Sequence, residues 1–359
     1  MSKDALLREE IARLTAYHVP DAADMVKLDA MENPYMLPLN VRESVAKKLL
    51  DAPINRYPDA EAKALKQALR ISLDIPHEAA VMLGNGSDEL IQIISLAFSK
   101  QDAVMLGLEP SFAMYPIIAA IAGMRYVGIP LNADFSLDLD RVLHALDEHQ
   151  PAVVFVAYPN NPTGNLFALE DLLTLIKKAP GIIVIDEAYY AFAQESFMPL
   201  LKQYENLMVM RTLSKQGLAG LRLGLIACAP KWHDYLEKLR LPYNVNTLSQ
   251  IAALEILQYG NILQEQARQI IEQRERLLAN LQALPGVEVF PSSANFLLFR
   301  VAQATRVFAS LKKRGVLIKA LHSAHGLLKD CLRVTVGRPA ENAIFLTALT
   351  ESIDETSAS

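Results

Sequence analysis

Four segments of the chain carry polar groups whose chemistry is complementary. They are a glycine-rich turn, an amide, a carboxylate, and an amine followed by a guanidinium: residues 84–86, Asn161, Asp186, Lys215 and Arg222. In this order they offer backbone N–H groups for an anion, a donor for a ligand oxygen, a negative charge and a nucleophile. Such a set could build a single ligand site.

Each segment also has an ordinary structural explanation when it is taken alone. Ser87 is a plausible N-cap for the apolar helix that follows the glycine-rich turn. Pro162 and Gly164 could stabilise a turn built on the amides of YPNNPTGN. An isolated Asp186 would form a structural ion pair or a helix cap, and lone lysines are usually solvated. The order and placement of the four segments is what favours a common site.

Short β-rich apolar runs precede these segments. Seven candidate strands alternate with helical stretches, at residues 80–83, 103–108, 124–131, 152–158, 181–189, 207–213 and 221–229. Continuous apolar runs with little alternation are typical of a sheet buried on both faces. We therefore predict an α/β domain with a mostly parallel seven-stranded sheet flanked by helices. Its carboxyl edge, where open α/β folds bind ligands, would carry the polar groups.

The pattern changes after Pro242. A long helical stretch is predicted at about residues 247–284, followed by strands in VEVF, NFLLFRV and CLRVTV, with a helix at 304–313 before the last strand. These elements predict a smaller α+β domain. Because no low-complexity linker separates the two parts, we expect the boundary within the long helix, and the first forty or so residues on the small domain. The predicted divisions are 45–245 for the large domain and 1–44 plus 246–359 for the small one.

Composition limits the class of partner. The net charge is −5 and no segment concentrates Lys and Arg, which argues against nucleic-acid binding. The N-terminal residues mix charged and apolar side chains, unlike a signal peptide or a membrane span. Cys228 and Cys331 form no close pair, and the seven histidines have no metal-ligand spacing. We expect a cytoplasmic protein that binds small molecules and no metal, nucleic acid or membrane.

Eleven sequence segments stand in order along nearly the whole chain: LDAMENPY, NRYPD, GNGSDE, EPSFAMY, YPNNPTG, DEAY, RTLSK, GLAGLRLG, PYNVN, ANFLLF and CLRVTVG. Together they resemble the fold-type I pyridoxal-phosphate aminotransferases, specifically the histidinol-phosphate aminotransferase family. The resemblance implies pyridoxal 5'-phosphate as cofactor and a homodimer. It also implies reversible amino transfer between L-histidinol phosphate and 2-oxoglutarate in histidine biosynthesis, giving 3-(imidazol-4-yl)-2-oxopropyl phosphate and L-glutamate.

The resemblance assigns roles around the cofactor ring. Lys215 would form the Schiff base and carry the proton between the substrate α-carbon and the cofactor C4' carbon. Asp186 would pair with the pyridine nitrogen, so that the ring can accept electrons. Asn161 and Tyr189 would donate to the ring oxygen O3'.

Further contacts implied by the resemblance concern the ring face and the phosphate. Phe112 would stack on the ring, with Tyr115 as a second candidate for that contact. The phosphate would rest at a helix start and accept from hydroxyls and a guanidinium, supplied by Gly86, Ser87, Asp88, Thr212, Ser214 and Arg222. Tyr57 resembles a tyrosine that reaches the phosphate from the other subunit, so that the site would be completed across a dimer interface.

Substrate contacts are implied for Arg333, Lys319, Asn33 and Tyr17. A planar guanidinium at position 333 suits either the substrate phosphate or the carboxylate of glutamate and 2-oxoglutarate. Lys319 departs from the family, in which many members have an arginine followed by Asp or Asn, and a point charge there would loosen phosphate discrimination. The loop between Lys215 and Arg222 is one residue shorter than in some relatives, which leaves its shape open. His322 and His325 are expected in an exposed loop nearby.

Two other kinds of function stay open. An aromatic or aspartate aminotransferase, or a phosphothreonine decarboxylase, would share the scaffold and keep Lys215, Asp186 and Asn161. A non-catalytic binder would need neither the nucleophile nor the carboxylate that pairs with the ring nitrogen, so the presence of both argues against it.

Overall fold

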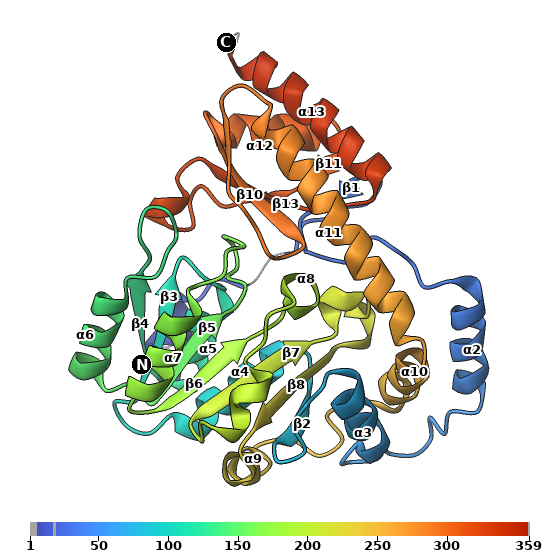
Figure 1. The fold of residues 1–359 in the computed structure, drawn as a ribbon, viewed down its shortest axis with the longest axis vertical. Coiled ribbons are helices and arrows are strands. Elements are labelled where there is room, and N and C mark those ends of the chain that lie inside the picture. The colour runs from blue at the N-terminus through green and yellow to red at the C-terminus, as the bar shows by residue number, and fades with distance from the viewer. Residues whose placement is uncertain (1–5, 17–18, 358–359) are drawn as a thin grey trace.

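A central sheet of seven strands organises the larger part of the molecule (Figure 1). The computed structural model describes residues 6–16 and 19–357. In spatial order the strands are β2 (Ala80–Asn85), β8 (Leu223–Cys228), β7 (Leu207–Thr212), β6 (Ile182–Asp186), β5 (Val153–Ala157), β3 (Val104–Glu109) and β4 (Arg125–Pro130). Only β8 runs antiparallel to its neighbours among these seven. The predicted mostly parallel seven-stranded sheet is confirmed.

Helices cover both faces of this sheet. Val153 and Phe155 pack into the apolar cluster on one face, whereas Val154 and Val156 pack into the cluster on the other. The first cluster includes α4 (Ser87–Phe98), α5 (Met114–Ala122) and α9 (Pro230–Leu236), and the second includes α3 (Lys63–Ser72), α6 (Leu139–His149) and α7 (Leu169–Lys178). Because both faces are buried, the strands need no polar side, which explains their continuous apolar runs.

A second, four-stranded antiparallel sheet lies in the smaller part, at the top of Figure 1. Its spatial order is β12 (Lys319–Ala320), β13 (Cys331–Thr335), β10 (Phe296–Val301) and β9 (Val287–Val289). Phe296, Phe299 and Phe345 are fully buried in its core. The helices α11 (Gly260–Gln282), α12 (Ala304–Lys313) and α13 (Pro339–Ser357) pack around it.

The helical stretch that joins the two parts is interrupted, so the prediction of one helix over 247–284 was wrong. α10 (Thr247–Leu257) ends before Tyr259, whose backbone is not helical and whose ring packs on the large core, and α11 then begins at Gly260. Glycine is a poor helix former, which makes this a weak point for a continuous helix. Ala253 packs in the core of the large sheet and Ile270 in that of the small one. We therefore propose the domain boundary at this interruption.

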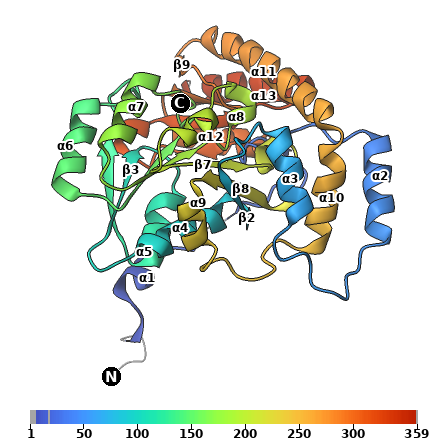
Figure 2. The same cartoon turned by 60° about the horizontal axis from the view of Figure 1, so that its bottom comes forward.

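The N-terminal segment is shared between the two parts. β1 (Val26–Lys27) pairs in parallel with β11 (Val316–Leu317), which attaches it to the smaller part. α1 (Glu9–Arg13) instead lies below α5 of the larger part (Figure 2), where Arg8 donates to the carbonyl of Ile121 at 2.6 Å. For these first residues the prediction was wrong. α2 (Leu39–Leu50) packs on α10, and the short α8 (Tyr190–Ala193) on α11. Across the described ranges, no helix is long and apolar enough to cross a membrane.

Candidate active site

A cavity of about 120 Å³ opens at the carboxyl edge of the large sheet. Its lining includes ten of the residues singled out from the sequence: Ser87, Asp88, Phe112, Asn161, Asp186, Tyr189, Thr212, Ser214, Lys215 and Arg222. A larger cleft of about 620 Å³ adjoins it and is lined by Arg333 and Lys319. The two spaces share Met31, Asp88, Phe112 and Asn161. Parallel strands that end at one edge thus bring together side chains that lie far apart in the chain.

Lys215 lies in a short 3-10 turn directly after β7, with its Nζ donating to the carbonyl of Ala30 at 3.1 Å. Burial, together with the nearby Arg333 guanidinium, lowers the pKa of Lys215 to about 8. Burial has this effect because it disfavours the charged ammonium form. The neutral, nucleophilic amine is therefore accessible close to physiological pH.

Asp186 is the last residue of β6, and its side chain is held by two hydrogen bonds. Oδ2 accepts from the Tyr115 hydroxyl at 2.9 Å, and Oδ1 accepts from the backbone N–H of Ala188 at 3.1 Å. Burial raises the pKa of Asp186 to about 7, although both hydrogen bonds oppose that shift. A buried carboxylate of this kind is stabilised by a cation placed against it.

Tyr115 therefore holds the carboxylate of Asp186 in place by a hydrogen bond from the buried side. The prediction that the Tyr115 ring could stack on the cofactor was wrong. Tyr115 is fully buried, stacks on Phe155 with ring centroids 5.0 Å apart, and is absent from the cavity lining. Phe112 lines the cavity instead and meets Tyr115 edge-on. The reason lies in α5, whose first turn directs Tyr115 into the core under the sheet edge.

Asn161 connects the cavity to the cleft. Its Nδ2 donates to the Tyr189 hydroxyl at 3.1 Å, and its Oδ1 accepts from Arg333. Arg333 also donates to the carbonyl of Asp29 at 3.1 Å. The neighbouring Asn160 is the amide that stabilises the turn, since it is fully buried and donates to the carbonyl of Pro110 at 3.0 Å. The structural explanation thus applies to Asn160, whereas Asn161 faces the cavity.

An anion cradle forms at the start of α4. Ser87 is the first helical residue and Gly86, with φ of 86°, precedes it, so the prediction of Ser87 as N-cap was wrong. A β-carbon on Gly86 would lie 2.5 Å from the Arg222 guanidinium, and this close approach needs glycine. Around this point lie the bare N–H groups of the helix, the guanidinium, and the hydroxyls of Thr212 and Ser214, which are 3.0 Å apart. Such donors fit a phosphate group.

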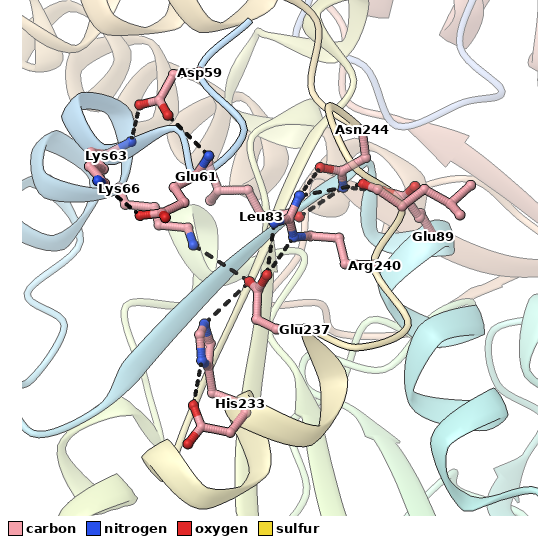
Figure 3. A network of polar contacts seen from close by, with 12 residues as sticks. Asp59, Glu61, Lys63, Lys66, Leu83, Glu89, His233, Glu237, Arg240 and Asn244 are labelled. Carbon is pink, nitrogen blue, oxygen red and sulfur yellow. Dashed lines mark hydrogen bonds and ion pairs between the residues drawn. The ribbon is translucent and has the colours of Figure 1, made fainter.

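A polar network behind the cradle fixes its position (Figure 3). Asn244 donates to the carboxylate of Glu89, in the first turn of α4, at 2.8 Å, and to the carbonyl of Leu83 at 3.1 Å. Arg240 in turn donates to Asn244 at 3.1 Å. This network could not be predicted from the sequence, because Leu83 and Asn244 lie 161 positions apart.

Glu237 anchors the outer part of that network. It forms ion pairs with Arg240 at 2.8 Å and Lys66 at 3.6 Å, and Nε2 of His233 lies 3.3 Å from its carboxylate. Burial alone would raise the pKa of Glu237, but the hydrogen bonds from His233 and Arg240 outweigh it and hold the pKa at about 2. The loop that carries Asn244 is thereby tied to α3 and α9.

Tyr57 and Asn33 line neither the cavity nor the cleft of their own chain. Tyr57 is 79% exposed and stacks on Tyr243, with ring centroids 4.5 Å apart. Asn33 donates to the side chain of Gln266 at 3.0 Å and lines a neighbouring cavity of about 260 Å³. Tyr17 lies outside the described residues.

The ion pair at the end of β6 and the two histidines near the cleft differ from the predictions. Glu187 forms a buried ion pair with Arg211 at 2.8 Å, so the structural ion pair expected near the end of β6 belongs to Glu187 and not to Asp186. His322 and His325 are half-buried, which corrects the prediction of an exposed loop. His325 lines the cleft, and its Nδ1 accepts from the N–H of Leu327.

The sequence and fold of this chain are similar to those of known aminotransferases. The family described as aminotransferase class I and II matches residues 23–349. Histidinol-phosphate aminotransferase 2 of Nitrosococcus oceani is 52% identical over 97% of this chain and 98% of its own. The crystal structure of histidinol-phosphate aminotransferase from Clostridium acetobutylicum has a TM-score of 0.84 at 25% identity, covering 92% of this chain and 99% of that one. The Sinorhizobium meliloti enzyme, crystallised in complex with pyridoxal-5'-phosphate, has a TM-score of 0.88 at 24% identity and 99% coverage of both chains. This chain belongs to the class I and II aminotransferases and, within them, to the histidinol-phosphate aminotransferases.

Proposed function

We propose that this chain transfers an amino group reversibly between L-histidinol phosphate and 2-oxoglutarate, with pyridoxal 5'-phosphate as cofactor. The observation that carries the proposal is the meeting of Lys215, Asp186 and the anion cradle in one cavity that adjoins Arg333. The name of the 52% identical relative supports the choice of substrate.

The residues of the cavity fit the cofactor. The start of α4, Ser214, Thr212 and Arg222 would hold its phosphate, and Phe112 would cover one face of its ring. Asp186, whose two hydrogen-bond partners in the described part of the chain are neutral, would meet the positively charged ring nitrogen. When bound, the cofactor supplies the electron sink that makes the α-proton of an amine labile.

Lys215 performs the proton transfer. Its Nζ would be the attachment point for the cofactor, and as a free amine it would take the α-proton of the bound substrate and later return a proton. A pKa near 8 suits this work, because the amine can both accept and release a proton near neutral pH. The carbonyl of Ala30, which accepts from Nζ, holds the freed amine over the cavity.

Asn161, Tyr189 and Arg333 orient the reactants. The Tyr189 hydroxyl and the Asn161 amide face the cavity and would donate to the ring oxygen. Arg333 reaches the boundary between cavity and cleft, and its guanidinium lies 5.1 Å from the ring centroid of Phe296. There it would bind the phosphate of histidinol phosphate and, in the second half of the reaction, a carboxylate of 2-oxoglutarate. Lys319, Asn33 and Tyr17 would add further substrate contacts.

We also propose that the working form is a homodimer. The stacked Tyr57 and Tyr243 are both exposed, and Ile54 and Leu241 beside them in the chain are 78% and 71% exposed. Exposed apolar groups of this kind mark interaction surfaces. Tyr57 would reach the phosphate site of the partner subunit.

We propose a cytoplasmic location from the two cysteines. Cys228 and Cys331 are buried free thiols, as is usual in a reducing compartment.

One set of assays tests the function. The holoenzyme is mixed with L-histidinol phosphate, phenylalanine or phosphothreonine, each with 2-oxoglutarate, and glutamate and carbon dioxide are measured. We expect glutamate from histidinol phosphate at the highest kcat/KM. Carbon dioxide from phosphothreonine without any amino acceptor would instead indicate a decarboxylase, and rapid glutamate formation from phenylalanine alone would indicate an aromatic aminotransferase.

A further inference from the structure

The cleft beside the cavity carries opposite charges on its walls. Arg333 and Lys319 line it from β13 and β12, whereas Glu109 lines it from the end of β3. Tyr126, from β4, and the apolar side chain of Met114 also face it. At about 620 Å³ the cleft has the volume of a small-molecule site. Arg333 has a role in the proposed reaction, whereas Glu109 and Tyr126 have none so far.

Two glycines make room for this pair. Gly107 of β3 and Gly128 of β4 are register partners in the middle of their strands. A β-carbon on Gly107 would lie 2.5 Å from the Tyr126 hydroxyl, and one on Gly128 would lie 2.4 Å from a carboxylate oxygen of Glu109. Glycine weakens a strand interior, and a close approach of another group is a common reason for its presence there. The two polar side chains therefore lie over the two glycines, on one face of the sheet.

The environment keeps the Tyr126 hydroxyl a donor. Burial and the Glu109 carboxylate both raise the pKa of Tyr126, so the phenol retains its proton. Within residues 6–16 and 19–357, no hydrogen bond or ion pair engages the Glu109 carboxylate or the Tyr126 hydroxyl. The cleft thus presents one acceptor and one donor that the described side chains leave for a ligand.

We propose that Glu109 and Tyr126 recognise the side-chain ring of the substrate and select imidazole over phenyl. This inference rests on the proposed function and names the specificity site of the same cleft. An imidazole offers one N–H donor and one nitrogen acceptor, which match the carboxylate of Glu109 and the hydroxyl of Tyr126. The substrate phosphate would lie toward Arg333, so the charges of the cleft would complement both ends of the molecule.

A phenyl ring in the same place would be rejected on energetic grounds. It would displace water from the carboxylate and hydroxyl without replacing the lost hydrogen bonds. Sites built to hydrogen-bond a polar substrate group discriminate strongly against analogues that lack it. The apolar side chains of Phe112 and Met114 would contact either ring equally and cannot discriminate by themselves.

The test compares two substrates that differ only in the ring, L-histidinol phosphate and L-phenylalaninol phosphate. For the holoenzyme variant Glu109→Leu we expect kcat/KM for the imidazole substrate to fall at least about tenfold, and that for the phenyl substrate to stay or rise. Glu109→Gln and Tyr126→Phe should give the same pattern more weakly. Glu195→Gln removes a carboxylate at an exposed position outside the cleft and should change neither value.

Equal losses with both substrates, or none with either, would overturn the inference. Calorimetry with non-reacting analogues, 3-(imidazol-4-yl)propyl phosphate and 3-phenylpropyl phosphate, tests ring selection independently of turnover. If the wild-type enzyme forms no glutamate from histidinol phosphate, the proposed function fails, and a preference for the imidazole analogue that Glu109→Gln weakens would still uphold the ring site. Should Glu109→Leu fail to fold, Glu109→Gln and Tyr126→Phe decide the question.

Discussion

The hydroxyl of Tyr115 donates to Oδ2 of Asp186 at 2.9 Å. Tyr115 is fully buried beneath the sheet edge and stacks on Phe155, so its hydroxyl is fixed. This contact stabilises the ionised form of a carboxylate whose burial favours the neutral form. Tyr115 is thus a positioning residue that acts through Asp186.

Tyr115→Phe should keep the fold and shift the pH dependence of catalysis. Loss of the hydrogen bond raises the pKa of Asp186, and the carboxylate then protonates at higher pH as the solution is acidified. The acid limb of the kcat/KM profile should move upward by about one pH unit. Tyr158→Phe is the matched control, because Tyr158 is also buried, packs on Phe197 and lies outside the cavity. Unchanged profiles in both variants would contradict the role of Tyr115.

Cofactor attachment to the cofactor-free enzyme should follow the pKa of Lys215. Burial and Arg333 lower that pKa to about 8, and only the neutral amine reacts. The rate should therefore rise with pH up to about 8 and then level off, as measured by borohydride trapping and mass spectrometry. Arg333→Gln should move the plateau to higher pH. A rate that keeps rising toward the ordinary lysine value near pH 10.4 would contradict the lowered pKa.

The positions of polar residues at the ends of strands could be predicted from the sequence. The contacts of residues that hold those side chains in place could not. Asn161, Asp186 and Lys215 could be found because each follows an apolar run, and parallel topology then places them at one edge. Tyr115 was assigned the wrong contact, since the direction of a side chain at a helix start depends on how that helix packs on the sheet. The interruption at Gly260 was missed because helix-forming residues such as Leu, Gln and Ala continue on both sides of it.

Lys319→Arg should sharpen the preference for a phosphate over a carboxylate. Lys319 pairs in register with Arg333 and lines the same cleft. A planar guanidinium can bind phosphate through two parallel hydrogen bonds, whereas an ammonium acts as a point charge. The ratio of kcat/KM for L-histidinol phosphate to that for L-histidine, which shares the imidazole, should rise several-fold. A ratio that falls would show that Lys319 does not contact the substrate anion.

Asn244→Ala should weaken cofactor binding without removing any group that touches the cofactor. Asn244 joins Glu89 at the start of α4 to Arg240, as Figure 3 shows, so its loss frees the cradle to move. We expect the Kd for pyridoxal 5'-phosphate, measured by equilibrium dialysis, to rise about tenfold. Asn246→Ala is the control, since Asn246 caps α10 and should cost about 1 kcal/mol of stability with little change in this Kd. Equal Kd values in the two variants would contradict a role in the cradle.

Glu237→Gln should destabilise the fold in a pH-dependent manner. The pKa of Glu237 is about 2 in the folded chain, below its ordinary value of 4.5, so its contribution is present above pH 4.5 and lost as pH falls toward 2. The variant should lose about 1 to 3 kcal/mol near neutral pH and progressively less at acidic pH. Denaturant unfolding followed by circular dichroism at several pH values measures this. A loss that does not depend on pH would indicate altered packing alone.

The most direct test of the central claim is glutamate formation by the purified holoenzyme from L-histidinol phosphate and 2-oxoglutarate, compared with Lys215→Ala. We predict one glutamate for each histidinol phosphate consumed by the wild type, and a loss of at least about a thousandfold in the variant. If histidinol phosphate yields no glutamate while phenylalanine does so rapidly, the proposed substrate is wrong. If Lys215→Ala retains wild-type turnover, the proposed role of Lys215 is wrong as well.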